Sequence, residues 1–438
     1  MPFGRTTPVA ISAARCTYIS SVGRRLLLVG AKRLVPTGCA LPFPLQKAAT
    51  ALFPGIMPKI MFFITEDWAF LSHRLVLGQA CRDAGWEVVI ATNVTDHGPE
   101  IQRHGFTLQP LPLNRRGANP FGELRTVLAV AAALRRHRPD ILHCVALKPV
   151  LYGNLAAICC GQRRTVSALA GMGYAFTGTS PKVRALRSLL VAGLRLLLRR
   201  PGNQVIVQND DDRALLLRHG IAVERRLTLI RGSGVDLAAL PATPPPPANQ
   251  PIIFALVARM LADKGIAEAV EAMRQLHRRG VACRLWLVGK LDPHNPSAFS
   301  ESQLRAWEAE SAAEWLGHRE DIAEIWRQAH VALLPSYREG MPKALLEAAA
   351  CGRPIITTDV IGCREVIEDG IEGILVPARE SEGLANAMQR LAEDQSLRLT
   401  MGRAARLRAE RHFGEERVVA QHFELYRRCL EGSGPCAA

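Results

Sequence analysis

The sequence predicts an α/β protein made of two parallel-sheet domains, each with helices on both faces of its sheet. From residue 57 onward, short apolar runs alternate with longer amphipathic segments, as expected for parallel strands joined by crossover helices. This alternation stops at a proline-rich segment, residues 241–247, and then starts again. With 438 residues, of which 48% are hydrophobic, the chain is long enough for two such cores.

Residues 1–56 have no long periodic segment and hold seven Lys or Arg residues but no Asp or Glu. Three interpretations are open: an extension upstream of a true start at Met57, a transit peptide, or a basic arm that contacts a membrane. We favour the first interpretation.

Residues 57–240 are expected to form the first domain. A helical pattern over residues 188–198 includes Arg195 and is too short and too charged to cross a membrane. It is equally typical of a basic amphipathic helix on a membrane surface and of a helix that packs on the core with a solvated Arg edge. The buried strands are predicted at residues 57–64, 87–91, 140–144 and 204–208, with an amphipathic stretch at 122–137.

Residues 241–251 are expected to be a stiff linker, because prolines exclude helix and inner strand. Residues 252–412 then form the second domain, and residues 413–438 form a helix and tail that pack back towards the first domain. Ligands of open α/β sheets bind at the carboxyl ends of the strands, so we expect a ligand cleft between the two halves. The strands of the second domain are predicted at residues 252–257, 284–288, 331–334 and 354–357.

Composition narrows the function classes. The net charge of +15 comes from the first half of the chain, which suits an anionic membrane surface, a nucleic acid or phosphorylated ligands. Only 5% of residues are aromatic, which argues against a base-stacking nucleic-acid platform. The eleven cysteines show no zinc spacing, so we interpret them as reduced thiols in a cytosolic protein. Neither half has a dinucleotide fingerprint or a phosphate-binding P-loop.

The segment from residue 333 to residue 348 carries the most information about chemistry. A buried strand ends near Pro335, a loop carries Glu339 and Gly340, and Pro342 suits the first position of a helix. The free N–H groups at the start of that helix form an anion site that suits a diphosphate. Glu339 and Glu347 could accept hydrogen bonds from different hydroxyl groups of one ligand. Alternatively, Glu339 only complements the helix dipole and Glu347 is a surface residue.

Two cations follow the first strand of the second domain. Arg259 and Lys264 lie in a loop at the carboxyl end of that strand, where they could bind a diphosphate. The alternative is that both are ordinary exposed loop residues.

The second domain resembles the nucleotide-binding domain of the family-4 retaining glycosyltransferases, which have the GT-B fold. In the first domain, the segments 63–68, 72–74, 143–149, 170–174 and 208–211 resemble a bacterial subgroup that acts on lipid-linked diphosphate sugars. The matching segments of the second domain are residues 259–265, 287–289, 315–322, 339–347 and 362–366.

The resemblance implies roles for individual residues. Glu339, Arg259 and Lys264 are the expected catalytic residues, Glu339 holding the donor sugar and the two cations neutralising the departing diphosphate. The expected donor-binding residues are Gly289, Leu316, Asp321, Ile322, Gly340, Met341, Pro342, Lys343 and Glu347. The expected acceptor-binding residues are His73, Arg74, His143, Lys148, Gly171 and Gly173. Many relatives also have a His after the strand that corresponds to residues 165–169, and this chain has none there.

The expected function is transfer of a hexose or N-acetylhexosamine from a UDP-sugar to an undecaprenyl-diphosphate-linked saccharide in bacterial surface-glycan assembly. The resemblance implies no metal and no cofactor besides the UDP-sugar substrate. The expected location is the cytoplasmic face of the bacterial inner membrane, without a nucleic-acid partner. A UDP-N-acetylglucosamine 2-epimerase-type enzyme and a non-catalytic nucleotide-sugar-binding protein are the alternatives. Contacts with anionic lipid are expected from Lys182, Arg184, Arg187, Arg195, Arg199 and Arg200.

Overall fold

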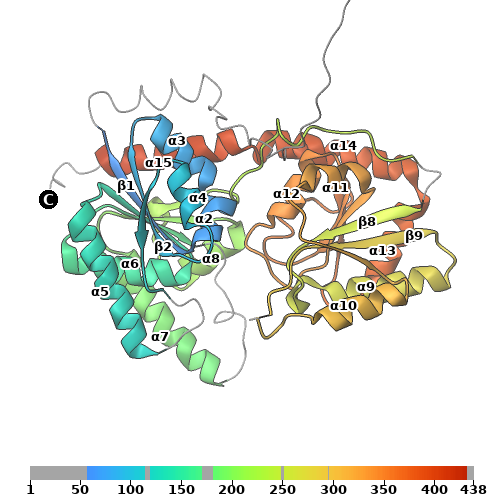
Figure 1. Ribbon diagram of the computed structural model, residues 1–438, viewed down its shortest axis with the longest axis horizontal. Helices are drawn as coiled ribbons and strands as arrows, with labels where there is room; N and C mark the ends of the chain where they lie inside the picture. The colour runs from blue at the N-terminus through green and yellow to red at the C-terminus, as the bar shows by residue number, and fades with distance from the viewer. Residues whose placement is uncertain (1–56, 114–118, 170–180, 248–250, 294, 432–438) are drawn as a thin grey trace, which may run out of the picture. The chain divides into compact units, whose positions relative to one another are not determined.

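The computed structural model describes residues 57–113, 119–169, 181–247, 251–293 and 295–431. These residues form two α/β domains, each built on a parallel sheet (Figure 1). The first sheet has seven strands in the order β3-β2-β1-β4-β5-β6-β7, and the second has six in the order β10-β9-β8-β11-β12-β13. The predicted pair of parallel-sheet domains is therefore confirmed.

The first domain begins with β1 and is covered by helices on both faces (Figure 1). Its strands are β1 (Lys59–Glu66), β2 (Glu87–Asn93), β3 (Thr107–Pro110), β4 (Ile141–Val145), β5 (Thr165–Leu169), β6 (Asn203–Val207) and β7 (Leu227–Leu229). Its helices are α2 (Asp67–His73), α3 (Leu75–Asp83), α4 (Gly98–Arg103), α5 (Pro120–His137), α6 (Leu147–Cys160), α7 (Pro181–Leu198) and α8 (Asp210–Arg218).

The second domain repeats the same alternation. Its strands are β8 (Ile252–Val257), β9 (Cys283–Val288), β10 (Glu314–Gly317), β11 (Val331–Leu334), β12 (Ile355–Thr358) and β13 (Gly373–Val376). Its helices are α9 (Ile266–Arg278), α10 (Glu301–Ala309), α11 (Ile322–Gln328), α12 (Lys343–Ala350), α13 (Ser381–Glu393) and α14 (Gln395–His412), and α15 (Glu415–Glu431) ends the described chain. None of the helices in the described ranges has the length and apolarity that a bilayer-spanning helix needs.

Strand β1 shows why the strands are continuously apolar. Ile60 and Phe62 belong to the core under α3 and α15, whereas Met61 and Phe63 belong to the core under α5 and α6. All four side chains are fully buried. Because successive side chains of a strand point to opposite faces, a sheet that is covered on both faces needs apolar residues at every position.

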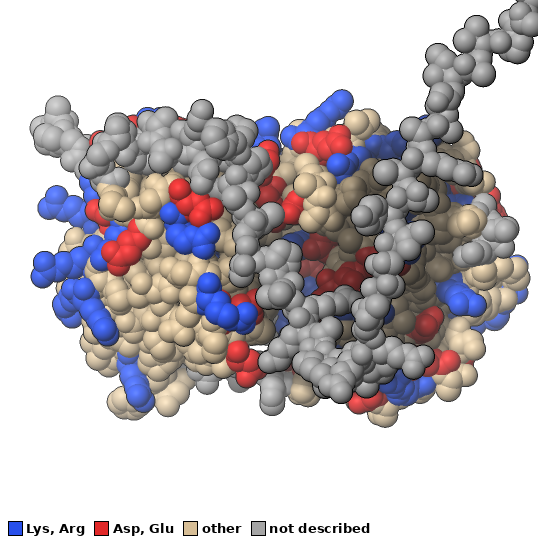
Figure 2. All heavy atoms as spheres, turned by 45° about the horizontal axis from the view of Figure 1, so that its top comes forward, with Lys and Arg blue, Asp and Glu red and all other residues tan. Residues whose placement is uncertain are grey.

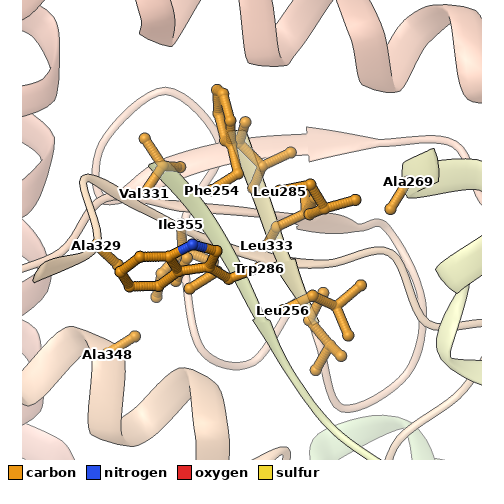
Figure 3. Close-up of a cluster of buried hydrophobic side chains, with 14 of the residues drawn as sticks. Phe254, Leu256, Ala269, Leu285, Trp286, Ala329, Val331, Leu333, Ala348 and Ile355 are labelled. Carbon is orange, nitrogen blue, oxygen red and sulfur yellow. The ribbon is translucent and has the colours of Figure 1, made fainter. Parts of the chain in front are cut away.

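The core of the second domain fixes the position of helix α12. Phe254, Leu285 and Leu333 come from three neighbouring strands, and Ala348 of α12 belongs to the same buried cluster (Figure 3). Leu346 on the same helix is also fully buried. The start of α12 is therefore held at the edge of the sheet by the packing of its later residues.

Helix α15 packs against the first domain. Phe423 and Tyr426 lie against Trp86, with ring centroids 5.7 and 5.6 Å from it. The Tyr426 hydroxyl is 2.6 Å from Nδ1 of His143, which is buried in strand β4. This hydrogen bond joins residues that are 283 positions apart.

The substitution Tyr426→Phe is expected to lower the unfolding free energy of the first domain by about 1–2 kcal/mol, because Nδ1 of buried His143 loses its partner. Thermal unfolding of the purified protein measures this loss. Arg428→Ala, on the exposed side of the same helix, is the control and should leave the melting temperature unchanged. Equal melting temperatures for Tyr426→Phe and the wild type would contradict the prediction.

Candidate active site

The loops that follow five strands of the second sheet meet at its carboxyl edge. They follow β8, β9, β10, β11 and β12, whose order in the sheet is β10-β9-β8-β11-β12. The Gly289 amide donates to the Gly317 carbonyl at 2.7 Å, and the Glu339 amide donates to the Ile361 carbonyl at 3.1 Å. These backbone contacts bring together loops that lie far apart in the sequence.

Glu339 is held by two side chains from this edge. Lys264 Nζ donates to Glu339 Oε1 at 2.6 Å, and Ser336 Oγ donates to the same oxygen at 2.8 Å. Both members of the Lys264–Glu339 ion pair are largely buried, with 14% and 15% of their side chains exposed. The structure thus brings two of the three predicted catalytic residues together. Sequence reasoning missed Ser336, although it lies only three residues before Glu339.

Gly362 lets a neighbouring loop pack closely against the backbone of Glu339. Its φ is +85°, and a Cβ atom at this position would lie 2.4 Å from the carbonyl oxygen of Glu339 and 2.7 Å from that of Gly340. Only glycine allows the backbone of residues 361–362 to approach this closely. The predicted motif at residues 362–366 therefore packs against the backbone of the loop that carries Glu339.

Arg259, the third predicted catalytic residue, is also paired. Its Nη1 lies 2.9 Å from Asp292 Oδ2. In the described residues, each of the two cations expected to face a diphosphate therefore has a carboxylate partner, Arg259 with Asp292 and Lys264 with Glu339. A bound anion would have to share or replace these partners.

The start of α12 lies beside this cluster. Pro342 is the N-cap residue, one position before the helix, and no side chain caps the first turn. Glu347, one turn into the helix, keeps only 16% of its side chain exposed and lies 3.8 Å from Lys343. Burial raises the pKa of the Glu347 carboxyl above its ordinary value, and the Lys343 ammonium limits that rise. Gly340 and Met341 complete the loop between Glu339 and this helix.

The residues expected near a nucleobase lie at the end of β10. Leu316 is in that strand, Asp321 is the N-cap residue of α11, and Ile322 is its first residue. The side chain of Asp321 pairs with Arg319, which lowers the pKa of the Asp321 carboxyl. Its carboxylate therefore already has a partner among the described residues.

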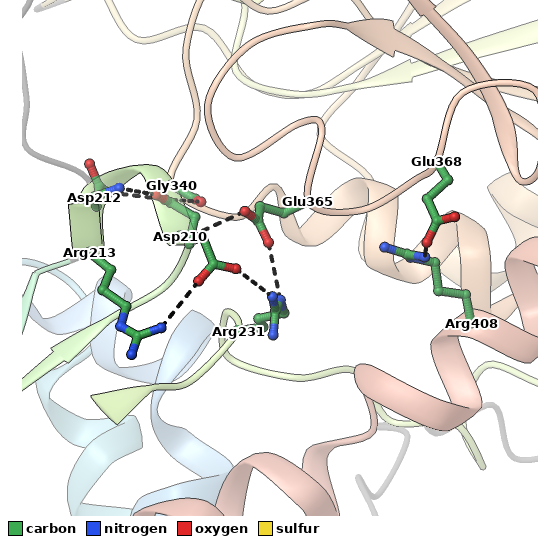
Figure 4. A network of polar contacts seen from close by, with 9 residues as sticks. Asp210, Asp212, Arg213, Arg231, Gly340, Glu365, Glu368 and Arg408 are labelled. Carbon is green, nitrogen blue, oxygen red and sulfur yellow. Dashed lines mark hydrogen bonds and ion pairs between the residues drawn. The ribbon is translucent and has the colours of Figure 1, made fainter. Parts of the chain in front are cut away.

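Residues of the first domain contact the same loop. Asn209 Nδ2 donates to the Gly340 carbonyl at 3.2 Å, and Lys343 Nζ donates to the Ser72 carbonyl at 3.1 Å. Arg231 pairs with Glu365, which also accepts a hydrogen bond from the amide of Asp210 (Figure 4). Sequence reasoning did not assign a role to Arg231 or Glu365. Their pairing depends on the placement of segments 134 residues apart.

The residues predicted to bind an acceptor are scattered. His73 and Arg74 lie at the junction of α2 and α3, and Lys148 at the start of α6 pairs with Glu123 at 2.7 Å. Gly171 and Gly173 lie outside the described residues. His143 is fully buried under α15, and its role at an acceptor stays a prediction. Burial lowers its pKa well below the ordinary value.

Comparisons with known proteins match both domains to glycosyltransferases. A family model described as "Glycosyl transferases group 1" matches residues 251–394, and one described as "Glycosyl transferase 4-like" matches residues 59–208. The chain is 26% identical over 383 residues to the N,N'-diacetylbacillosaminyl-diphospho-undecaprenol alpha-1,3-N-acetylgalactosaminyltransferase of Campylobacter jejuni, covering 84% of this chain and 98% of that protein. It is 21% identical to the capsular polysaccharide biosynthesis glycosyltransferase CapM of Staphylococcus aureus, covering 78% and 90% of the two chains.

Two solved structures share the fold. Sucrose-phosphate synthase from Thermosynechococcus elongatus superposes with a TM-score of 0.70 at 23% identity, over 86% of this chain and all of that one. The Anabaena protein Alr3699/HepE, solved in complex with UDP and glucose, superposes with a TM-score of 0.68 at 19% identity, over 84% and 99% of the two chains.

The substitution Lys264→Met is expected to weaken UDP binding about tenfold or more, because a charge-assisted contact with phosphate is worth about 1.5–3 kcal/mol. Isothermal titration calorimetry with UDP measures the change. Arg284→Met, an exposed cation in strand β9, is the matched control. Unchanged UDP affinity in Lys264→Met would remove Lys264 from the donor site.

Proposed function

Because the chain belongs to the family-4 glycosyltransferases of the GT-B fold, we propose that it moves a hexose or N-acetylhexosamine from a UDP-sugar to a saccharide on undecaprenyl diphosphate. The observation that carries this proposal is the Glu339 cluster at the start of α12. A carboxylate that can accept sugar hydroxyls lies 2.6 Å from a cation that can meet phosphate.

The reaction exchanges one bond at the anomeric carbon. The acceptor hydroxyl oxygen bonds to this carbon, the bond to the UDP oxygen breaks, and the hydroxyl proton passes to the departing phosphate on the same face. This order retains the configuration and needs no protein nucleophile. Glu339 positions the donor sugar, and Lys264 and Arg259 offset the negative charge that grows on the leaving group. Glu347 and the backbone at residues 321–322 are assigned to the ribose and the base.

No metal has a part in this proposal. The two cations and the N–H groups at the start of α12 supply the positive potential that a leaving diphosphate needs. The proposed donor is a UDP-sugar, and no further cofactor is assigned.

Transfer is tested by offering several labelled UDP-sugars to the purified protein with bacterial membranes and counting the label in the organic extract. Label is expected in lipid with the wild type and is expected to fall at least a thousandfold in Glu339→Ala. Glu382→Ala, an exposed carboxylate at the start of α13, should keep full transfer. An epimerised UDP-sugar without labelled lipid would favour the epimerase-type alternative, and retained transfer in Glu339→Ala would remove Glu339 from the mechanism.

We also propose that the first domain contacts an anionic membrane through helices α5, α6 and α7. These helices carry eight Lys or Arg residues and one acidic residue, Glu123, which is paired with Lys148. Lys and Arg side chains line the edge of the first domain in Figure 2. A basic surface of this kind is attracted to anionic lipid by about 1 kcal/mol per residue near the membrane.

The same helices expose large apolar side chains. Leu189 and Leu196, seven residues apart on α7, are 73% and 75% exposed. Leu194 and Leu198 on the opposite side of α7 are fully buried in the sheet core. The helix therefore packs on its sheet through one side and exposes leucines on the other. A core-packing helix and an amphipathic helix on a membrane surface are both compatible with this arrangement. The other exposed apolar side chains on α5 and α6 are Phe121, Leu124, Leu128, Leu155 and Ile158.

The double substitution Leu189→Glu/Leu196→Glu is expected to lower binding to vesicles with anionic phosphatidylglycerol at least tenfold, because each leucine contributes about 1.5–3 kcal/mol on burial. Co-sedimentation with vesicles of equal parts phosphatidylglycerol and phosphatidylcholine measures binding. Leu407→Glu, on α14 and 51% exposed, is the control. Equal binding by the double variant and the wild type would contradict the assigned surface.

A further inference from the structure

A cavity of about 200 Å³ lies where four segments of the chain meet. It is lined by the junction of α2 and α3, by Ser233, by the start of α12 and by the first two turns of α15. Its polar lining includes His73, Arg74 and Lys343. Arg259, Lys264 and Glu339 do not line it, so it is distinct from the catalytic cluster and shares only the Lys343 end of the donor loop.

Arg74 is the unusual residue of this cavity. Only 4% of it is exposed, yet no ion pair to Arg74 is found in the described ranges. Its Nη1 donates to the carbonyl of the adjacent residue, His73, at 2.8 Å, and its Nε has no partner. A guanidinium stays protonated in proteins, and a buried charge without a counter-ion is unfavourable. Among the described residues, the guanidinium therefore has no counter-ion.

The other groups around Arg74 do not supply that anion. His422 also lines the cavity, and its Nδ1 is 2.8 Å from the Val418 carbonyl while its Nε2 has no partner. Burial and the Arg74 charge lower the pKa of His422 to about 3, so its ring is neutral. The Tyr426 hydroxyl is neutral as well, because burial raises its pKa well above the ordinary value. Neutral rings solvate a cation in part but do not balance its charge.

Glu415 is the one carboxylate among the residues that line the cavity. Burial, together with the nearby carboxylate of Asp236, raises its pKa to about 7. At neutral pH it is therefore partly protonated, so it balances the Arg74 charge only in part. In its protonated form, Glu415 can donate a hydrogen bond to an oxygen of a bound anion.

From this arrangement we propose that the cavity binds a phosphate or diphosphate group, with Arg74 as its main partner and Lys343 as the second cation. A guanidinium presents paired N–H groups that match phosphate oxygens. A volume of about 200 Å³ holds such a group, whereas whole drug-sized ligands occupy about 300–1,000 Å³. The apolar walls, which include Leu75, Val418 and Val419, keep the local dielectric low and strengthen the attraction.

Two sources could supply this group: a free phosphate compound, or the diphosphate of an isoprenoid-linked substrate. The second source rests on the proposed function, whereas the first does not. Lys343 follows the loop that carries Glu339, and its ammonium donates to the carbonyl of Ser72, which also lines the cavity. Lys343 therefore connects the cavity to that loop. An anion bound here would therefore contact the first domain and the start of α12 together.

The test is isothermal titration calorimetry on the full chain with saturating UDP, which fills the donor site. Inorganic pyrophosphate and farnesyl diphosphate are titrated separately. Both are expected to bind the wild type, and Arg74→Met is expected to weaken both at least tenfold. Farnesyl diphosphate that binds at least tenfold more tightly than pyrophosphate would identify an isoprenoid-linked source, and equal affinities would identify a free phosphate compound.

The melting temperature is a second readout, which distinguishes an anion-binding arginine from a purely structural one. Without ligand, Arg74→Met should melt at the same temperature as the wild type or higher, because the variant removes an unbalanced buried charge. Arg82→Met, an exposed cation on α3, should bind both probes as the wild type does. If Arg74→Met fails to fold, Lys343→Met and Arg74→Lys replace it, each with an expected loss of about fivefold. Absence of binding to the wild type, or wild-type binding by these variants, would overturn the proposal.

Discussion

The constraint on which the site depends is that all strands of a parallel sheet end at the same edge. Lys264 and Glu339 are 75 residues apart, yet their side chains are 2.6 Å apart because β8 and β11 are neighbours in the second sheet. The Tyr337 amide donates to the Asp263 carbonyl between the same two loops. The Lys264–Glu339 ion pair is therefore a consequence of strand order, and each loop only refines its position.

The positive charges at the two proposed anion sites are balanced to different extents, and this affects how strongly each site would bind an anion. At the carboxyl edge of the second sheet, Arg259 and Lys264 are each paired with a carboxylate, so a bound anion would gain only the difference between its own interaction and that of the carboxylate it replaces. In the cavity proposed to bind an anion, Arg74 has no carboxylate partner among the described residues, so an anion would gain most of the interaction.

Much of the fold could be predicted from the sequence, because strands that are buried on both faces are continuous apolar runs. The predicted strands at residues 252–257 and 331–334 have the same bounds in the structure as β8 and β11. The apolar runs do not show which face a side chain meets. The motif around His143 therefore does not predict that α15, nearly three hundred residues later, covers its side chain.

The interaction partners of the candidate site residues could not be predicted from the sequence, for the same reason. The segment around Glu339 and the cations Arg259 and Lys264 could be identified from their positions after strands. Their pairing with one another and with Asp292 depends on sheet register and loop contacts, which the sequence does not specify. The absence of a counter-ion for Arg74 among the described residues also depends on packing. The sequence does not distinguish Arg74 from an ordinary surface arginine, and only the structure shows that it is buried.

The first domain carries more positive charge and more exposed apolar surface than a UDP-sugar requires. The residues proposed to bind the donor lie at the edge of the second sheet, and the proposed donor site gives the leucines of α7 and the guanidinium of Arg74 no role. A small neutral acceptor would use neither feature. An acceptor that joins an apolar chain to a diphosphate would use both, the chain near the basic helices and the diphosphate near a buried cation. The surplus charge of the first domain thus favours an anionic, lipid-linked acceptor over a soluble neutral sugar.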